Sequence, residues 1–180
     1  SITLLGNATM NIEVNTSFTD PGYSASDNIN GDITNDVIVS GDTVNVTVPN
    51  TTFNIYYNVS DSKGNNAIQK IRNINIVDTI NPVVVLIGGD VTINEGDTYV
   101  EPGYSASDNS GESLTVVVTG SVNESVVSDY ILQYSATDSS NNVHTVSRLV
   151  HVISAITYIP AVKYIRLEGQ GQDFYFNEVQ

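Results

Sequence analysis

The stretch PGYSASDN occupies residues 21–28 and occurs again, unchanged, at residues 102–109. Identity over eight consecutive positions in a chain of 180 residues far exceeds chance, so it indicates a duplicated unit. The architecture therefore has to be derived repeat by repeat.

The two copies stay in step beyond this stretch. Upstream the offset is 81 residues, which places Asp20 over Glu101, and downstream it falls to 76, which places Arg72 over Arg148. The second copy is therefore shorter in its loops. The sequence predicts one repeat at residues 1–78, a second at 79–154, and an unrelated segment at 155–180.

Hydrophobic residues within each repeat recur with a period of two, which is typical of a half-buried strand. In the stretch TFNIYYNVSD, which ends at Asp61, the predicted inward residues are Phe53, Ile55, Tyr57 and Val59. In the matching stretch of the second repeat they are Tyr130, Leu132, Tyr134 and Ala136.

Further strands of the first repeat are predicted to begin at Ile2, Met10, Gly22, Asp36, Val44 and Ala67. These short segments are separated by Gly, Asn, Asp and Pro clusters, and no stretch has helical periodicity. The predicted fold is all-β, with two tandem immunoglobulin-like antiparallel β-sandwiches and a C-terminal β-hairpin segment.

Each repeat carries (D/E)PG, then YSASDN, a Tyr-x-x-x-Asp strand, an Asn-rich turn, and a last strand that ends in IVDT or VIS. This pattern resembles the bacterial immunoglobulin-like repeats of surface and secreted proteins, including a module of a pesticidal crystal protein, and more distantly the hyalin-type repeats. The resemblance covers residues 1–154. It implies a spacer, stalk or adhesin segment rather than an enzyme.

The junction VDTINPVV, residues 77–84, contains Pro82. Proline fixes its own φ and favours an extended conformation at the preceding residue, here Asn81. We expect the chain to pass directly from one repeat into the next as a stiff tandem.

Composition excludes several classes of partner. The net charge is −14 with only 6 Lys and Arg, which argues against nucleic acid and against an anionic membrane surface. No apolar run is long enough to span a bilayer. Cysteine is absent, so thiols do not indicate the redox compartment. Because the chain opens on Ser1 within a predicted strand, we expect it to be a processed or excised part of a longer protein. The resemblance to repeats of surface and secreted proteins implies an extracellular or cell-surface location.

The last segment breaks the repeat. Its stretch AVKYIRLEGQGQDFYFNEVQ, residues 161–180, resembles an early hairpin of the discoidin, or coagulation-factor C-type, sandwich, a family that often binds sugars or lipid head groups. Two strands that expose large apolar residues need a partner. Either the rest of a discoidin-like domain covers them, or another copy of the chain pairs with them head to tail to form a fibre. The residues predicted to mediate such assembly are Tyr164, Ile165, Leu167, Phe174, Tyr175 and Phe176.

Calcium is the one candidate cofactor, because it prefers oxygen ligands and the turns are rich in Asp and Asn. The candidate ligands are Asp27, Asn28, Asn30 and Asp32 in the first repeat and Asp108, Asn109 and Glu112 in the second. The alternative is that these are ordinary turn residues, which bind their own backbone.

Six Asn-x-Ser/Thr motifs are candidate glycosylation sites if the source modifies them. They lie at Asn7, Asn15, Asn45, Asn50, Asn58 and Asn123.

No nucleophile motif, phosphate loop or zinc spacing is present, and His144 and His151 are predicted on opposite faces of one strand. We therefore expect a non-catalytic structural protein, a stalk, spacer or fibre-forming subunit. The alternatives are a glycan-binding adhesin segment that uses a discoidin-like C-terminal domain, and accessory repeats of a secreted hydrolase.

Overall fold

Every regular element longer than a single turn is a β-strand in the computed structural model, which describes residues 1–155. In the first repeat the strands form one sheet in the order β1-β3-β4 and another in the order β2-β7-β6-β5. The elements are β1 (Ile2–Leu4), β2 (Thr9–Glu13), β3 (Tyr23–Asp27), β4 (Gly31–Asp32), the 3₁₀ turn η1 (Thr34–Asp36), β5 (Ile38–Gly41), β6 (Thr51–Asn58) and β7 (Lys70–Val77).

The second repeat has the same plan with a two-stranded sheet, β10-β8, and a four-stranded sheet, β11-β12-β13-β9. Its strands are β8 (Val83–Leu86), β9 (Val91–Asn94), β10 (Tyr104–Ser107), β11 (Val116–Thr119), β12 (Ser128–Thr137) and β13 (Val143–Ile153). The all-β fold of immunoglobulin-like sandwiches is confirmed. We call the two sandwiches the first and second domain.

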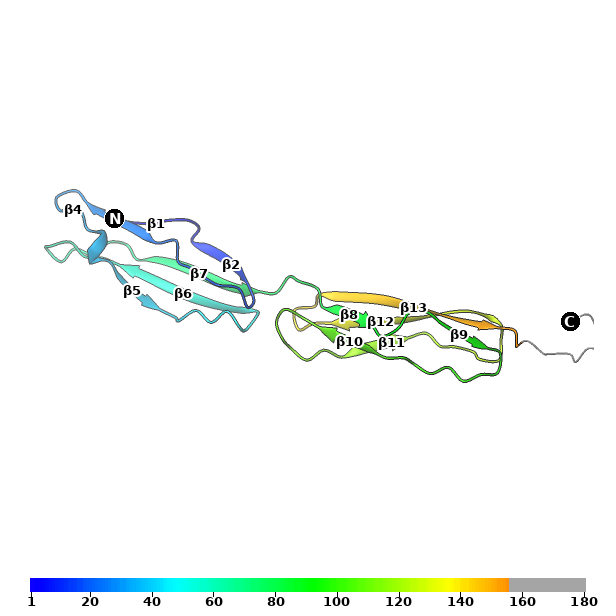
Figure 1. Cartoon of the computed structure of the whole chain (residues 1–180). Helices are drawn as coiled ribbons and strands as arrows, with labels where there is room; N and C mark the ends of the chain where they lie inside the picture. Colours follow the sequence, from blue (N-terminus) through cyan, green and yellow to red (C-terminus); the bar gives the residue numbers. More distant parts are fainter. Residues whose placement is uncertain (156–180) are drawn as a thin grey trace, which may run out of the picture.

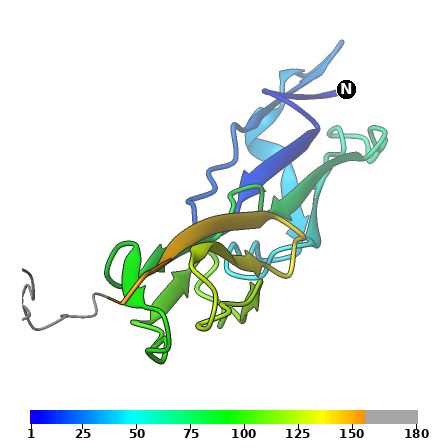
Figure 2. The ribbon, with the colours of Figure 1, turned by 90° about the vertical axis from the view of Figure 1, so that its right-hand side faces the viewer.

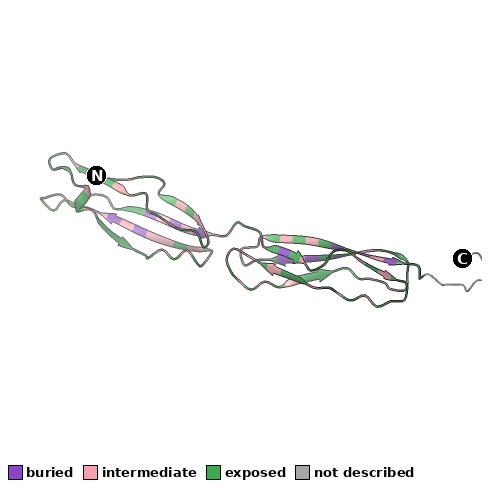
Figure 3. Ribbon diagram, viewed as in Figure 1, coloured by how far each residue is buried: buried purple, intermediate pink, exposed green. Residues whose placement is uncertain are grey.

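One hydrophobic core joins the two sheets of each domain. In the first domain Ile2 and Ala25 from one sheet pack with Tyr57 and Ile74 from the other. Buried residues alternate with residues of intermediate burial in the second half of β6, and with mostly exposed residues in β12 (Figure 3). Tyr57 and Tyr134 are both 0% exposed, so the predicted inward faces of these strands are confirmed.

Each domain contains one parallel pair of strands, which the predicted antiparallel packing did not include. β2 runs parallel to β7, and β9 runs parallel to β13. The cause is that the first strand changes sheets: β1 pairs antiparallel with β3, and the chain then crosses at Gly6, which has a φ of 69°, to reach β7. Glycine adopts this left-handed conformation at little cost.

The strand predicted at Val44 does not form. The alternation of residues 44–48 mimics a strand, but the Asn45 side chain accepts hydrogen bonds from the backbone and hydroxyl of Thr47, which closes a local turn. Asn side chains compete with strand ladders in this way. Val44 and Val46 nevertheless pack against the core.

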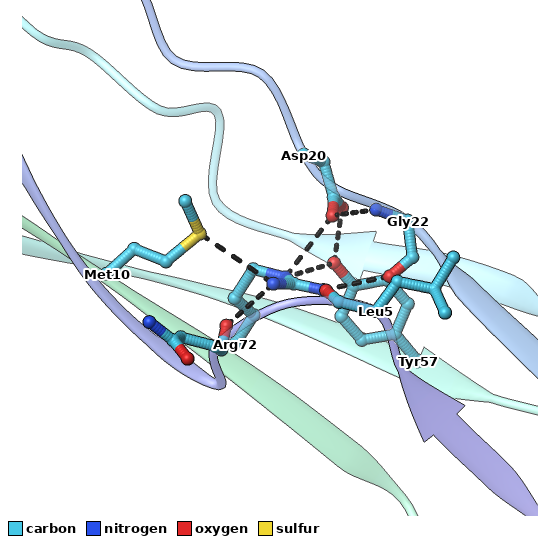
Figure 4. A network of polar contacts seen from close by, with 7 residues as sticks. Leu5, Met10, Asp20, Gly22, Tyr57 and Arg72 are labelled. Carbon is cyan, nitrogen blue, oxygen red and sulfur yellow. Dashed lines mark hydrogen bonds and ion pairs between the residues drawn. The ribbon is translucent and has the colours of Figure 1, made fainter.

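A fully buried arginine closes each sandwich at the place where the first strand changes sheets: Arg72 in the first domain (Figure 4) and Arg148 in the second. Arg72 donates hydrogen bonds to the carbonyl oxygens of Leu5, Asn7 and Gly22, at 2.8, 2.7 and 2.9 Å. Its Nε lies 3.2 Å from Asp20, which also accepts a hydrogen bond from the Tyr57 hydroxyl. The guanidinium thus donates to three backbone carbonyls, of which that of Gly22 also accepts the Leu5 N–H. Buried backbone groups require such partners.

The two domains follow one another along the long axis, with the N-terminus at the far end of the first domain (Figure 1 and Figure 2). The connection from β7 to β8 spans residues 78–82, and Pro82 is buried at its end. This places the end of β7 beside the loops that follow β10 and β12.

Candidate functional site

The junction between the domains is held by hydrogen bonds from asparagine side chains. Asn15 and Asn50 of the first domain and Asn109 and Asn142 of the second domain donate across it. The acceptors are the carbonyl oxygens of Asn109, Ser110 and Asp78, the Ser140 hydroxyl and the Glu13 carboxylate. The junction is therefore a polar interface between the two domains.

Three carboxylates converge at this junction. One oxygen from each of Asp78, Asp108 and Glu112 lies within 4.8 Å of the other two. Asp78 follows β7 in the first domain, whereas Asp108 and Glu112 belong to the loop after β10 in the second. The Asn109 amide, beside them, contacts Glu13 at 3.3 Å.

Several oxygen atoms of this cluster are buried without a hydrogen-bond partner. They are Oδ2 of Asp78, Oδ1 of Asp108 and Oδ1 of Asn109. Asp78 is only 6% exposed, and its other oxygen is 3.4 Å from the backbone N–H of Ile80. Native proteins satisfy most buried polar atoms, so unpaired oxygens that share one place require an explanation.

The electrostatics of the cluster are strongly negative. Burial raises the pKa of Asp78, and the charges of Asp108, Asp138 and Glu13 raise it further. Within residues 1–155 the ion pairs are Arg72–Asp20, Arg148–Glu101 and His151–Asp129, so none of them involves this cluster.

The pKa of Glu13 is shifted in the opposite direction from that of Asp78, because Thr79 donates hydrogen bonds to the Glu13 carboxylate. Partial burial alone would raise its pKa, but hydrogen bonds from the backbone and hydroxyl of Thr79 and from Asn109 outweigh this and lower it. Glu13 therefore faces the junction as a carboxylate.

The candidate calcium ligands of the first domain do not form such a group. Oδ1 of Asp27 accepts hydrogen bonds from the N–H groups of Ile29 and Asn30, which lower its pKa, and Asp32 binds the Thr34 N–H in the same way. Asn28 is exposed, and the Asn30 amide contacts Ser62. These residues hold their own turns beside an open, polar hollow of about 380 Å³.

The candidate ligands of the second domain lie near one another at the junction. Two acidic residues of the first domain, which the sequence did not indicate as ligands, lie there as well. Asp108, Asn109 and Glu112 all lie at the junction, with Asp78 and Glu13 opposite them. One signal was available in the sequence: the last strand of the first repeat ends in VDT, where that of the second ends in VIS.

The candidate glycosylation sites lie in two settings. The side-chain nitrogens of Asn15 and Asn50, which modification would use, donate across the junction. Asn7, Asn45 and Asn123 are exposed, and Asn58 lies on the predicted outward face of β6, half-buried beside Gln69.

Two other predicted features can be located. His144 accepts a hydrogen bond from the Val84 N–H, and His151 pairs with Asp129, on the opposite face of β13. The predicted hairpin and its assembly residues, from Tyr164 to Phe176, lie outside the described residues. Within residues 1–155 no helix is long and apolar enough to cross a membrane.

Comparison with known proteins finds relatives of the repeats. An uncharacterised 81.3 kDa protein of Acholeplasma phage L2 is 27% identical over 149 residues, which cover 76% of this chain and 19% of that protein. The chain thus spans about a fifth of the length of the curated relative that it matches.

Two solved structures show weak likeness. A lipoprotein of Bacteroides thetaiotaomicron matches with a TM-score of 0.39 and 17% identity, over 83% of this chain and 79% of that one. The CBM51-2 and INT domains of Clostridium perfringens ZmpB, in complex with GlcNAc, match with a TM-score of 0.35 and 18% identity, over 73% of this chain and 29% of that one. Neither likeness bears on function.

The Ig-like domain family of bacterial surface proteins matches residues 2–76 and again residues 88–152. The two matches cover both sandwiches and most of the chain, and the family is generally non-catalytic. The chain belongs to the bacterial surface Ig-like domain family.

Proposed function

We propose that the tandem domains act as a non-catalytic spacer in an extracellular or cell-surface assembly, holding the parts of a longer protein at a fixed separation. The observation that carries this proposal is the end-to-end order of the domains, with a short connection and asparagine side chains that tie one domain to the other (Figure 1). Membership of a surface-protein family supports the location.

Dimensions favour this role. The longest strand, β13, has 11 residues, which corresponds to about 36 Å at about 3.3 Å per residue. Two such domains in line separate their outer ends by roughly 70 Å. A compact globule of this chain length would have a radius of gyration near 16 Å. We expect X-ray scattering of the chain to give a clearly larger value, with the profile of a rod.

The surface location is tested by antibody labelling of the cells or particles that carry the protein, and the spacer role is tested by a glycan array. Antibodies against residues 1–154 are expected to label intact cells or particles as strongly as permeabilised ones. Labelling only after permeabilisation would contradict the surface role. Specific binding of residues 1–154 to glycans on an array would contradict the spacer, and it would also contradict an adhesin that binds glycans through a discoidin-like domain beginning at residue 155.

A further inference from the structure

We propose that the junction of the two domains is a calcium site, built by Asp78 from the first domain and Asp108, Asn109 and Glu112 from the second, with Glu13 as a further carboxylate at its edge. This assignment does not depend on the spacer role, because it concerns only the chemistry of the junction. Its consequence is that calcium controls how firmly the two domains hold together.

The unpaired oxygens are the first reason. Asp78, which is 6% exposed, keeps Oδ2 free of any partner. Oδ1 of Asp108, a residue of the same carboxylate cluster, and Oδ1 of Asn109, the next residue along the chain, are also buried and free. A proton on Asp78 would satisfy one neighbouring acceptor at most and would leave the others unpaired. One cation satisfies all of them at once.

The type of ligand is the second reason. Every free atom is a carboxylate or amide oxygen, with no imidazole or thiol in the group, which is the donor set of a hard cation. Calcium accepts irregular arrangements of six to eight oxygens and bidentate carboxylates, whereas Mg²⁺ demands near-octahedral geometry and keeps most of its water. A divalent charge also offsets the mutual repulsion of acidic groups that no ion pair within residues 1–155 relieves.

Comparison of the two repeats shows that the acidic residues which the first domain contributes to the junction are absent from the equivalent positions of the second domain. Glu13 pairs with Val77 in the first domain, and the equivalent pair in the second domain is Asn94 with Ile153. The residue after β7 is Asp78, whereas the residue after β13 is Ser154. Glu13 and Asp78 of the first domain are therefore replaced by Asn94 and Ser154 at the equivalent positions of the second domain.

The first domain supplies the matched control. Asp27 is the equivalent of Asp108 in the repeated PGYSASDN stretch. It ends β3 and pairs with Gly31 of β4, the strand at the outer end of the first domain (Figure 1). Asp27→Asn and Asp108→Asn make the same change of charge in the same kind of turn. In both turns an oxygen remains to accept the backbone N–H that the aspartate now binds.

The first experiment titrates the full chain with CaCl₂ by calorimetry, up to about 10 mM, because extracellular calcium modules bind at about 10⁻⁴–10⁻³ M. The wild type and Asp27→Asn are expected to bind one ion with equal affinity, and Asp108→Asn to bind about tenfold more weakly or not at all. The thermal midpoint should rise with calcium only in the two binding proteins.

Other outcomes of the titration would refute the proposed calcium site. No binding by the wild type, unchanged binding by Asp108→Asn, equal loss in Asp27→Asn, or Mg²⁺ bound as tightly as calcium would each do so. If Asp108→Asn fails to fold, Asp78→Asn replaces it, since removing a buried negative charge is expected to preserve folding in chelator.

The second experiment measures the junction directly. The chain contains no cysteine, so Ser40→Cys and Thr119→Cys, exposed positions on β5 and β11, place one spin label on each domain. Pulsed electron resonance should give a narrow distance distribution in calcium and a broader one in chelator or with Asp108→Asn, and Asp27→Asn should match the wild type. Identical distributions in calcium and chelator would refute control of the junction by the metal.

Discussion

At the scale of single residues, the buried arginines explain why each repeat keeps a carboxylate before its Pro-Gly. Arg148 contacts Glu101 and donates to the carbonyl oxygens of Ile87 and Gly103 at 2.8 and 3.1 Å. In the first domain the shorter Asp20 reaches Nε of Arg72 instead. Both pairs are sheltered, so removing one partner leaves a buried charge without compensation.

Glu101 makes the second domain sensitive to acid. Partial burial alone would raise its pKa, but hydrogen bonds from Tyr134, Tyr99 and the Gly103 N–H, together with the Arg148 charge, lower it below the ordinary value of 4.5. The unfolded chain therefore binds more protons than the folded one in this range. The stabilisation is complete above about pH 4.5 and is lost as the pH falls through the lower folded pKa.

We expect Glu101→Gln to lower the free energy of unfolding at neutral pH by up to about 3 kcal/mol, because it leaves the buried Arg148 charge without its partly exposed partner. The difference from wild type should shrink on acidification, as measured by urea unfolding between about pH 3 and pH 6. Glu95→Gln, an exposed change in the same domain, is the control. Curves for wild type and Glu101→Gln that stay parallel over this range would contradict the assignment.

At the scale of elements, the turns after β6 and β12 share one backbone conformation but place different residues at its left-handed position. Asp61 and Asp138 each accept the backbone N–H groups of their turn. The left-handed position is Gly64 in the first turn, with a φ of 85°, and Asn141 in the second, with a φ of 71°. Glycine and asparagine are the residues that tolerate this conformation.

Asn141→Gly is therefore expected to leave the stability of the second domain within about 1 kcal/mol of wild type, whereas Asn141→Val should cost about 1–2 kcal/mol or more. Thermal and urea unfolding of the two variants measure this directly. If valine were tolerated as well as glycine, the turn would not require the left-handed conformation.

The elements also show what the sequence can predict. The alternation in β6 and β12 identified Tyr57 and Tyr134 as buried, because period two reports directly which face is covered. The same pattern failed at residues 44–48, where the Asn45 side chain forms a local turn instead of a ladder. Asp108, Asn109 and Glu112 could be named from turn composition. Glu13, 96 residues from its contact with Asn109, could not, because only the packing of one domain on the next brings them together.

At the scale of the whole molecule, the junction depends on two asparagines in the left-handed backbone conformation. Asn15 and Asn50 both have a φ of 59° and use their side-chain amides to contact the second domain. Asn15 reaches two carbonyl oxygens, those of Asn109 and Ser110, at 2.8 and 3.2 Å. Glycine would keep the backbone conformation and remove the contact.

This substitution separates junction strength from domain stability. We expect Asn15→Gly to broaden the distance distribution between spin labels on Ser40→Cys and Thr119→Cys, since two hydrogen bonds across the junction are lost. The unfolding of each domain should change little, because the lost contacts lie between domains rather than within a core. Asn141→Gly makes the same change at a left-handed position between Ser140 and Asn142, whose own contacts across the junction it leaves in place, so it should broaden the distribution less than Asn15→Gly does. If both variants broadened it equally, backbone flexibility rather than the Asn15 amide would hold the domains in line.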